Sequence, residues 1–210
     1  TSTGVPFVQS TFDALWSGAA TGTLCDGGGG THHGQVGVLY DTMAQRWVAM
    51  DVAYSDIDNG PYFICVAVSI TDPNSTAIVP ATFFTNANWY YYTIEVKGSE
   101  TGPSLYPDLP RIALWPDGYY LTADLYDLTN NGLNKTPSGA KVWALNREDL
   151  VNGDMTTFRS HSVYLTESQN KHGLQPSNTL GTPAPTGTPN FVAAIAPPNN
   201  FYLWKYAVNW

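Results

Sequence analysis

The sequence predicts an all-β fold built of repeated antiparallel four-stranded meanders. Aromatic residues make up 13% of the chain and charged residues only 12%, and 19 Gly and 15 Pro interrupt it. Aromatic residues favour strands and Gly and Pro favour turns, whereas long surface helices need more Lys, Glu, Arg and Ala. A length of 210 residues is typical of one all-β domain, so we expect residues 1–210 to form a single folding unit.

The first meander is predicted over residues 34–97. Gln35–Asp41 is followed by a short turn and by Arg46–Tyr54, which indicates a hairpin. The apolar run Tyr62–Ile70 and the aromatic run Trp89–Val96 follow after turn-rich segments. Four successive strands of this kind form one antiparallel meander, which has the size of a propeller blade.

A second unit, residues 108–165, repeats this plan. Its strands are predicted at Arg111–Trp115, Tyr119–Tyr126, Ala140–Leu145 and Met155–Leu165. Between the last two strands, residues 146–153 indicate a short helical turn that ends at Gly153.

The third unit, residues 189–210, is incomplete. It contains the predicted strands Asn190–Ile195 and Phe201–Val208, and Val5–Trp16 is expected to be the outer strand of a preceding unit. A propeller closes with about four to eight blades, so about three blades form only an incomplete propeller. We expect either more chain or neighbouring copies to complete it, because an unclosed array exposes apolar faces and strand edges.

The two cysteines are interpreted as a disulfide. Cys25 precedes a glycine run and Cys65 lies in a predicted strand, so the bond would join a loop to a strand; two unconnected thiols are the alternative. A disulfide of this span contributes about 3 to 4 kcal/mol to stability and indicates an oxidising compartment. The sequence has no apolar run long enough for a membrane-spanning helix, and we expect an extracellular or cell-surface protein.

Several motifs carry a resemblance to a known family. They are Val38–Asp41, Arg46–Trp47, Tyr62–Ser69, Thr71–Pro73, Tyr106–Ala123, Leu174–Pro176, Gly187–Phe191 and Leu203–Trp210. In this order they resemble bacterial extracellular β-propeller proteins of poorly defined function, over most of residues 12–210. The resemblance implies a propeller-type fold, recurrence of both cysteines as a pair, and further chain beyond Trp210. It implies no catalytic residues.

The charge balance disfavours nucleic acid as a partner. The chain has 17 acidic and 9 basic residues, and its formal net charge is −8. A phosphate backbone would be repelled unless the cations were concentrated on one face, and the Lys and Arg residues are instead scattered singly.

Some residues are candidates for glycan chemistry. Asn74 and Asn134 each begin an N-glycosylation triplet in a predicted surface turn. Trp89 and Tyr91 are candidates for stacking on a sugar, although alternate rings of a strand face the core and core packing is the favoured interpretation. The carboxylates of Asp51, Glu95, Asp124 and Asp127 are candidates for a glycosidase pair that the sequence cannot assign.

Two further features are compatible with metal binding. The oxygen-rich loops Asp56–Gly60 and Asp127–Gly132 are candidates for structural calcium, but neither has EF-hand spacing and Asx turns explain both. His32 and His33 follow a glycine run, and we interpret them as part of a flexible surface loop. No cofactor is expected.

The sequence therefore favours a structural or interaction module, secreted or at the cell surface, that associates with protein partners or with itself. A carbohydrate-active enzyme or a glycan-binding lectin is the alternative, and an enzymatic role is less favoured than a non-enzymatic one.

Overall fold

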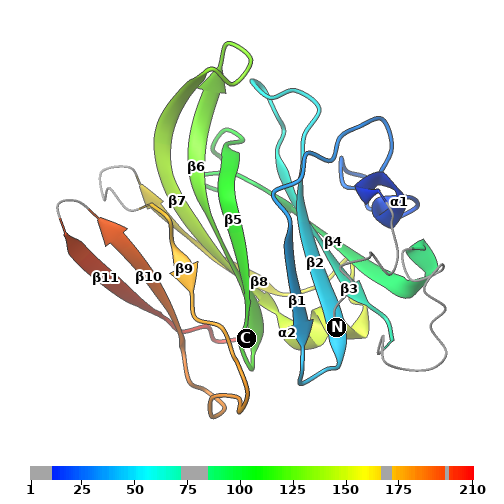
Figure 1. Cartoon of the computed structure of the whole chain (residues 1–210), viewed down its shortest axis with the longest axis vertical. Helices are drawn as coiled ribbons and strands as arrows, with labels where there is room; N and C mark the ends of the chain where they lie inside the picture. The colour runs from blue at the N-terminus through cyan, green and yellow to red at the C-terminus, as the bar shows by residue number, and fades with distance from the viewer. Residues whose placement is uncertain (1–10, 72–84, 167–171, 197–198) are drawn as a thin grey trace, which may run out of the picture.

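The computed structural model describes residues 11–71, 85–166, 172–196 and 199–210. Over these residues it confirms an all-β chain of antiparallel sheets with few helices (Figure 1). The first sheet contains β1 (Gly37–Asp41), β2 (Arg46–Ala53), β3 (Phe63–Ser69) and β4 (Trp89–Glu95). The second sheet contains β5 (Tyr106–Leu114), β6 (Gly118–Thr129), β7 (Asn134–Asn146) and β8 (Ser160–Thr166). The third sheet contains β9 (Gln175–Pro176), β10 (Asn190–Ala196) and β11 (Asn200–Tyr206).

The two four-stranded sheets confirm the predicted antiparallel meanders. In each of them every strand pairs with the next one along the chain. The third sheet has the order β11-β10-β9, and its short strand β9 was not predicted. The three sheets lie side by side in the order of the sequence (Figure 1).

The prediction of an outer strand over Val5–Trp16 is wrong where the structure describes it. Phe12–Trp16 forms helix α1, and residues 5–10 lie outside the described residues. The Thr11 hydroxyl accepts a hydrogen bond from the Ala14 N–H at 3.1 Å, which caps the first turn. Leu15 and Trp16 are buried by this helix against the first sheet.

The predicted helical turn after β7 is confirmed as α2 (Arg147–Asn152). The Asn146 side chain accepts from the Asp149 N–H at 3.0 Å, and Gly153 ends the helix with φ 86°. Strand β8 begins later than predicted, because Asp154–Thr157 forms a turn in which Thr157 N–H donates to Asp154 O at 3.3 Å. A short 3₁₀ helix, η2 (Asn86–Asn88), precedes β4.

The main core lies between the first and second sheets. Its largest members include Tyr92, Tyr119, Trp143, Leu121 and Ile64. The other face of the second sheet is also covered, because Ala140 and Val142 pack against Val192 and Ala194 of the third sheet and against Leu174 just before it. Alternate residues of β7 thus enter different cores, as the two-residue period of a strand requires.

Buried and half-buried polar side chains join the first two sheets at both ends. At one end Asp41, whose side chain is fully buried, accepts from Tyr119 Oη at 2.7 Å and from Arg147 Nε at 2.6 Å. At the other end Asp58 accepts from the backbone N–H groups of Asn131 at 2.7 Å and Gly132 at 2.8 Å. The loop before β3 and the turn after β6 meet there (Figure 1).

We expect Asp41→Ala to lower the free energy of unfolding by about 3 kcal/mol, because the change leaves the Arg147 guanidinium without its buried counter-ion. Urea unfolding followed by tryptophan fluorescence measures this change. Glu100→Ala, at an exposed position without a hydrogen bond to a described residue, is the control and should change stability by less than about 0.5 kcal/mol. Equal stability of the two variants would contradict the role assigned to Asp41.

Candidate functional site

The outer face of the third sheet exposes a row of apolar side chains. We call this surface the open face, and it consists of Phe191, Ala193, Ile195, Phe201, Leu203 and Lys205. Ile195 is opposite Phe201 and Ala193 is opposite Leu203 in the register, so these side chains share one side of the sheet. The residues Ile195, Phe201 and Leu203 are 76%, 66% and 58% exposed.

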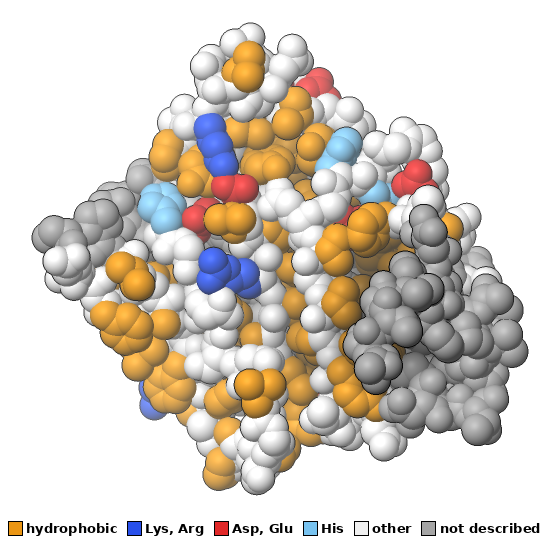
Figure 2. All heavy atoms as spheres, viewed as in Figure 1, with side chains coloured by type: hydrophobic (Ala, Val, Ile, Leu, Met, Phe, Trp, Pro, Cys, Tyr) orange, Lys and Arg blue, Asp and Glu red, His pale blue; other side chains and the backbone are white. Residues whose placement is uncertain are grey.

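Figure 2 shows hydrophobic side chains gathered over the region of β10 and β11. Scattered apolar residues are normal on a protein surface, but contiguous rows mark contact sites. The inward residues Val192 and Ala194 on the same strand are buried against the second sheet. The strand is therefore apolar on both sides, a pattern expected for a sheet with a cover on each face.

Strand β11 is also an open edge among the described residues. It pairs with β10 on one side, and the third sheet has no described strand on its other side. The first and second sheets have a fourth strand, β4 or β8, in the corresponding position. An edge strand presents unpaired backbone N–H and C=O groups that favour pairing with another chain.

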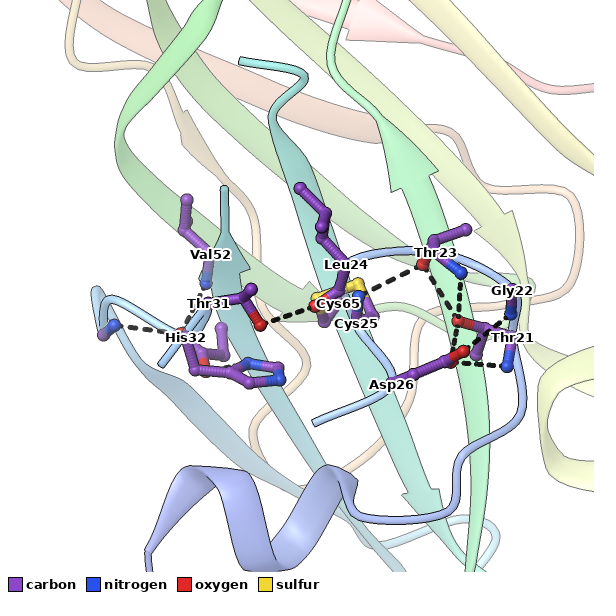
Figure 3. Close-up of a disulfide and its surroundings, with 12 residues drawn as sticks. Thr21, Gly22, Thr23, Leu24, Cys25, Asp26, Thr31, His32, Val52 and Cys65 are labelled. Carbon is purple, nitrogen blue, oxygen red and sulfur yellow. Dashed lines mark hydrogen bonds and ion pairs between the residues drawn. A yellow bond between two sulfur atoms is a disulfide. The ribbon is translucent and has the colours of Figure 1, made fainter. Parts of the chain in front are cut away.

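The predicted disulfide between Cys25 and Cys65 is present, with both residues fully buried. It fastens the loop after α1 to β3 (Figure 3). Within this loop the Asp26 carboxylate accepts from the Gly22 N–H at 2.9 Å, and the Thr31 hydroxyl donates to Leu24 O at 3.0 Å. The loop and α1 therefore cover the face of the first sheet that points away from the second sheet.

Trp89 and Tyr91 belong to this covered core. They are 4% and 3% exposed, and the Tyr91 hydroxyl donates to Leu15 O at 2.7 Å. Neither ring offers a face to solvent, and this burial favours core packing over a sugar platform for both residues. The alternation along β4 places both rings on the side covered by α1.

The side chain of His32 is buried, which corrects the prediction of a surface loop for both histidines. Its Nδ1 lies 2.8 Å from Asp51 Oδ2, and its ring stacks on Trp16 with centroids 5.5 Å apart. Asp51 also accepts from the Gly34 N–H at 3.1 Å. This candidate carboxylate therefore positions the loop backbone. His33 is exposed and stacks on Tyr54.

Two of the other carboxylate candidates, Glu95 and Asp124, have separate partners. Glu95 pairs with Lys97 at 2.7 Å, and Asp124 accepts from the Gly173 N–H at 2.8 Å. Burial raises the pKa of Asp124 above its usual range. Asp51 and Glu95 lie in the first sheet, whereas Asp124 and Asp127 lie in the second.

The carboxylates of the first oxygen-rich loop accept hydrogen bonds from nitrogen. The Asp56 carboxylate accepts from the Asp58 N–H at 2.8 Å and from the Asn59 side chain at 2.8 Å. These bonds hold the pKa of Asp56 below its usual range. An Asx turn therefore accounts for the first loop, and Asp58 of this loop accepts from two backbone N–H groups of the second loop.

Asn134 lies at the exposed start of β7, where an attached glycan would point into solvent. Asn74 lies outside the described residues.

The sequence patterns did not identify a cleft of about 540 Å³ at the end of the second sheet, which is lined by residues of α2 and by Trp210. Its residues are far apart in the sequence, so no local motif marks it.

Comparisons with protein families, with curated proteins and with solved structures found no match for this chain. Within the described ranges, no group of three or more His, Cys, Asp and Glu side chains could hold a metal ion. No described helix is long and apolar enough to cross a membrane.

We expect the Cys25→Ala/Cys65→Ala variant to lose about 4 kcal/mol of stability, because the bond closes a loop with a sequence separation of 40 residues. Urea unfolding with and without a reducing agent measures this change. Reduction should lower the stability of the native chain to that of the double variant and should leave the variant unchanged. A native chain that is insensitive to complete reduction would contradict the expected contribution.

Proposed function

We propose that this chain is an extracellular structural module of the β-propeller type that associates with a second copy through the open face. The observation that carries the proposal is the exposure of Ile195, Phe201 and Leu203 in one row on a strand pair whose opposite side is buried. A sheet with two apolar faces gains stability when the second face is covered.

The relation between the sheets supports the propeller reading. The first strands of successive sheets are neighbours: a Cβ on Gly37 of β1 would lie 2.9 Å from Ile112 of β5. Beyond β9, the Thr179 N–H donates to Leu114 O of β5 at 2.8 Å. Innermost strands that follow one another around an axis are the arrangement of propeller blades. We infer that the three sheets correspond to three such blades.

The chemistry of the open face favours a second copy as its occupant. The chain has a net charge of −8, which opposes association of two copies, but the open face carries only one charged residue, Lys205. Two identical apolar faces can meet about a two-fold axis, where each patch contacts its own equivalent. Burial of a large apolar side chain contributes about 1.5–3 kcal/mol, so three per copy can support a dimer.

The disulfide supports the extracellular part of the proposal. Both cysteines of the chain are used in it, and no free thiol remains. Disulfides persist in oxidising compartments and are rare in the cytosol.

We expect the native chain to form dimers at micromolar concentrations in sedimentation velocity. The Phe201→Thr/Leu203→Thr variant should weaken the dimer at least tenfold, because it removes apolar area from the contact, and the β-branched threonines that it introduces are suited to a strand. Circular dichroism would verify that the variant keeps its sheets.

The control is Leu133→Thr/Leu180→Thr, which changes two leucines that are 78% and 85% exposed and lie outside the open face. It should dimerise like the native chain. A native chain that stays monomeric at every concentration, or equal dimerisation of the open-face variant, would overturn the proposal.

A further inference from the structure

The cleft at the end of the second sheet has the features of a ligand site. Its volume is about 540 Å³, within the range of small-molecule sites. It lies where β6 begins, where β7 ends and where α2 follows. Its lining residues are Pro116, Asp117, Asn146, Arg147, Glu148, Val151, Asn152, Arg159, Thr186 and Trp210.

Two arginines of the cleft are held in place by buried carboxylates. Arg147 binds Asp41 through Nε at 2.6 Å and Nη2 at 3.3 Å. Arg159 binds Asp149 through Nε at 2.8 Å and Nη2 at 2.7 Å. The Nη1 group of each guanidinium has no hydrogen bond to a described residue. Each arginine therefore retains donors for a ligand while its charge is balanced within the protein.

Two carboxylates supply acceptors in the same cleft. Asp117 accepts from Trp210 Nε1 at 2.9 Å and from the Tyr120 hydroxyl at 3.2 Å. Burial, with the nearby Asp117, raises the pKa of Tyr120, so its hydroxyl stays protonated and donates. Glu148 is exposed and has no hydrogen bond to a described residue.

Trp210 supplies an apolar surface of fixed orientation. The hydrogen bond from its Nε1 to Asp117 fixes one edge of the indole, and the ring of His161 lies against it with centroids 5.4 Å apart. The side chain is half-buried, so part of the ring remains accessible from the cleft. A tryptophan held by its N–H can pack its apolar ring on a ligand without losing conformational freedom.

We propose that this cleft binds a neutral saccharide. A phosphate or carboxylate ligand would meet Asp117 and Glu148, and a cationic ligand would meet Arg147 and Arg159. A neutral polyhydroxyl ligand avoids both repulsions. Its hydroxyl groups donate to the two carboxylates and accept from the Nη1 groups, and the apolar C–H face of a sugar ring packs on Trp210.

This inference is independent of the association proposed above, because no residue of the open face lines the cleft. It also places glycan recognition at a different tryptophan from the buried Trp89. The separation allows the two proposals to be tested with one set of variants.

The test uses the full chain on an immobilised panel of neutral, sialylated and sulfated glycans, followed by titration calorimetry with soluble neutral oligosaccharides. We expect binding to neutral glycans only. Trp210→Ala should weaken it at least tenfold and Glu148→Gln several-fold, whereas Trp210→Phe should retain part of the affinity. Near-UV circular dichroism verifies the fold of each variant.

Glu100→Gln is the matched control for Glu148→Gln, because it removes an exposed charge outside the cleft. The Phe201→Thr/Leu203→Thr variant should bind glycans normally, and Trp210→Ala should dimerise normally. The proposal is overturned if no neutral glycan binds at millimolar concentration, if acidic glycans bind best, or if Trp210→Ala and Glu148→Gln both bind like the native chain.

Discussion

The arrangement of this chain follows from one constraint, which is that its sheets are apolar on both faces. Strand β6 is buried without interruption over its first eight positions, so the second sheet needs a cover on each side. The first sheet supplies one cover and the third sheet the other. The first sheet needs a second cover in turn, and α1 with the disulfide-linked loop provides it. The third sheet has an apolar outer row and no described cover, and this difference between the two ends of the stack is the basis of the proposed association.

Apolar stacking alone does not orient one sheet on another, and the polar contacts have this role. Asp41 and Asp58 connect the first and second sheets at opposite ends, and Gln35 connects their inner strands through the Tyr106 hydroxyl at 2.6 Å. A chain with so few charged residues uses several of them in buried pairs, such as Asp51 with His32. Buried polar groups require specific partners, so these contacts favour one register of the stack over alternatives with similar apolar burial.

The sequence predicts the parts of this structure that depend on local patterns. Alternation and turn residues were sufficient for the two meanders, and the position of Cys65 in an apolar strand supported the disulfide. Strand β9 was missed because a pair of residues carries no periodicity, and α1 was missed because its few residues also fit a strand. The contact between the two Asp-rich loops was not predictable. Asp58 and Asn131 are separated by 73 positions, and each loop has an Asx-turn explanation of its own.

The cleft depends on the same stacking as the fold. Arg147 follows β7 of the second sheet, but the carboxylate that orients its guanidinium belongs to Asp41 at the end of β1. The donors at one wall of the cleft are therefore positioned only when the first two sheets are packed together. The other wall includes Trp210, which follows β11 of the third sheet and is held by Asp117 at the start of β6. The cleft is thus lined by residues at one end of the second sheet and by Trp210 after the third, and Asp41 of the first sheet orients one of its arginines.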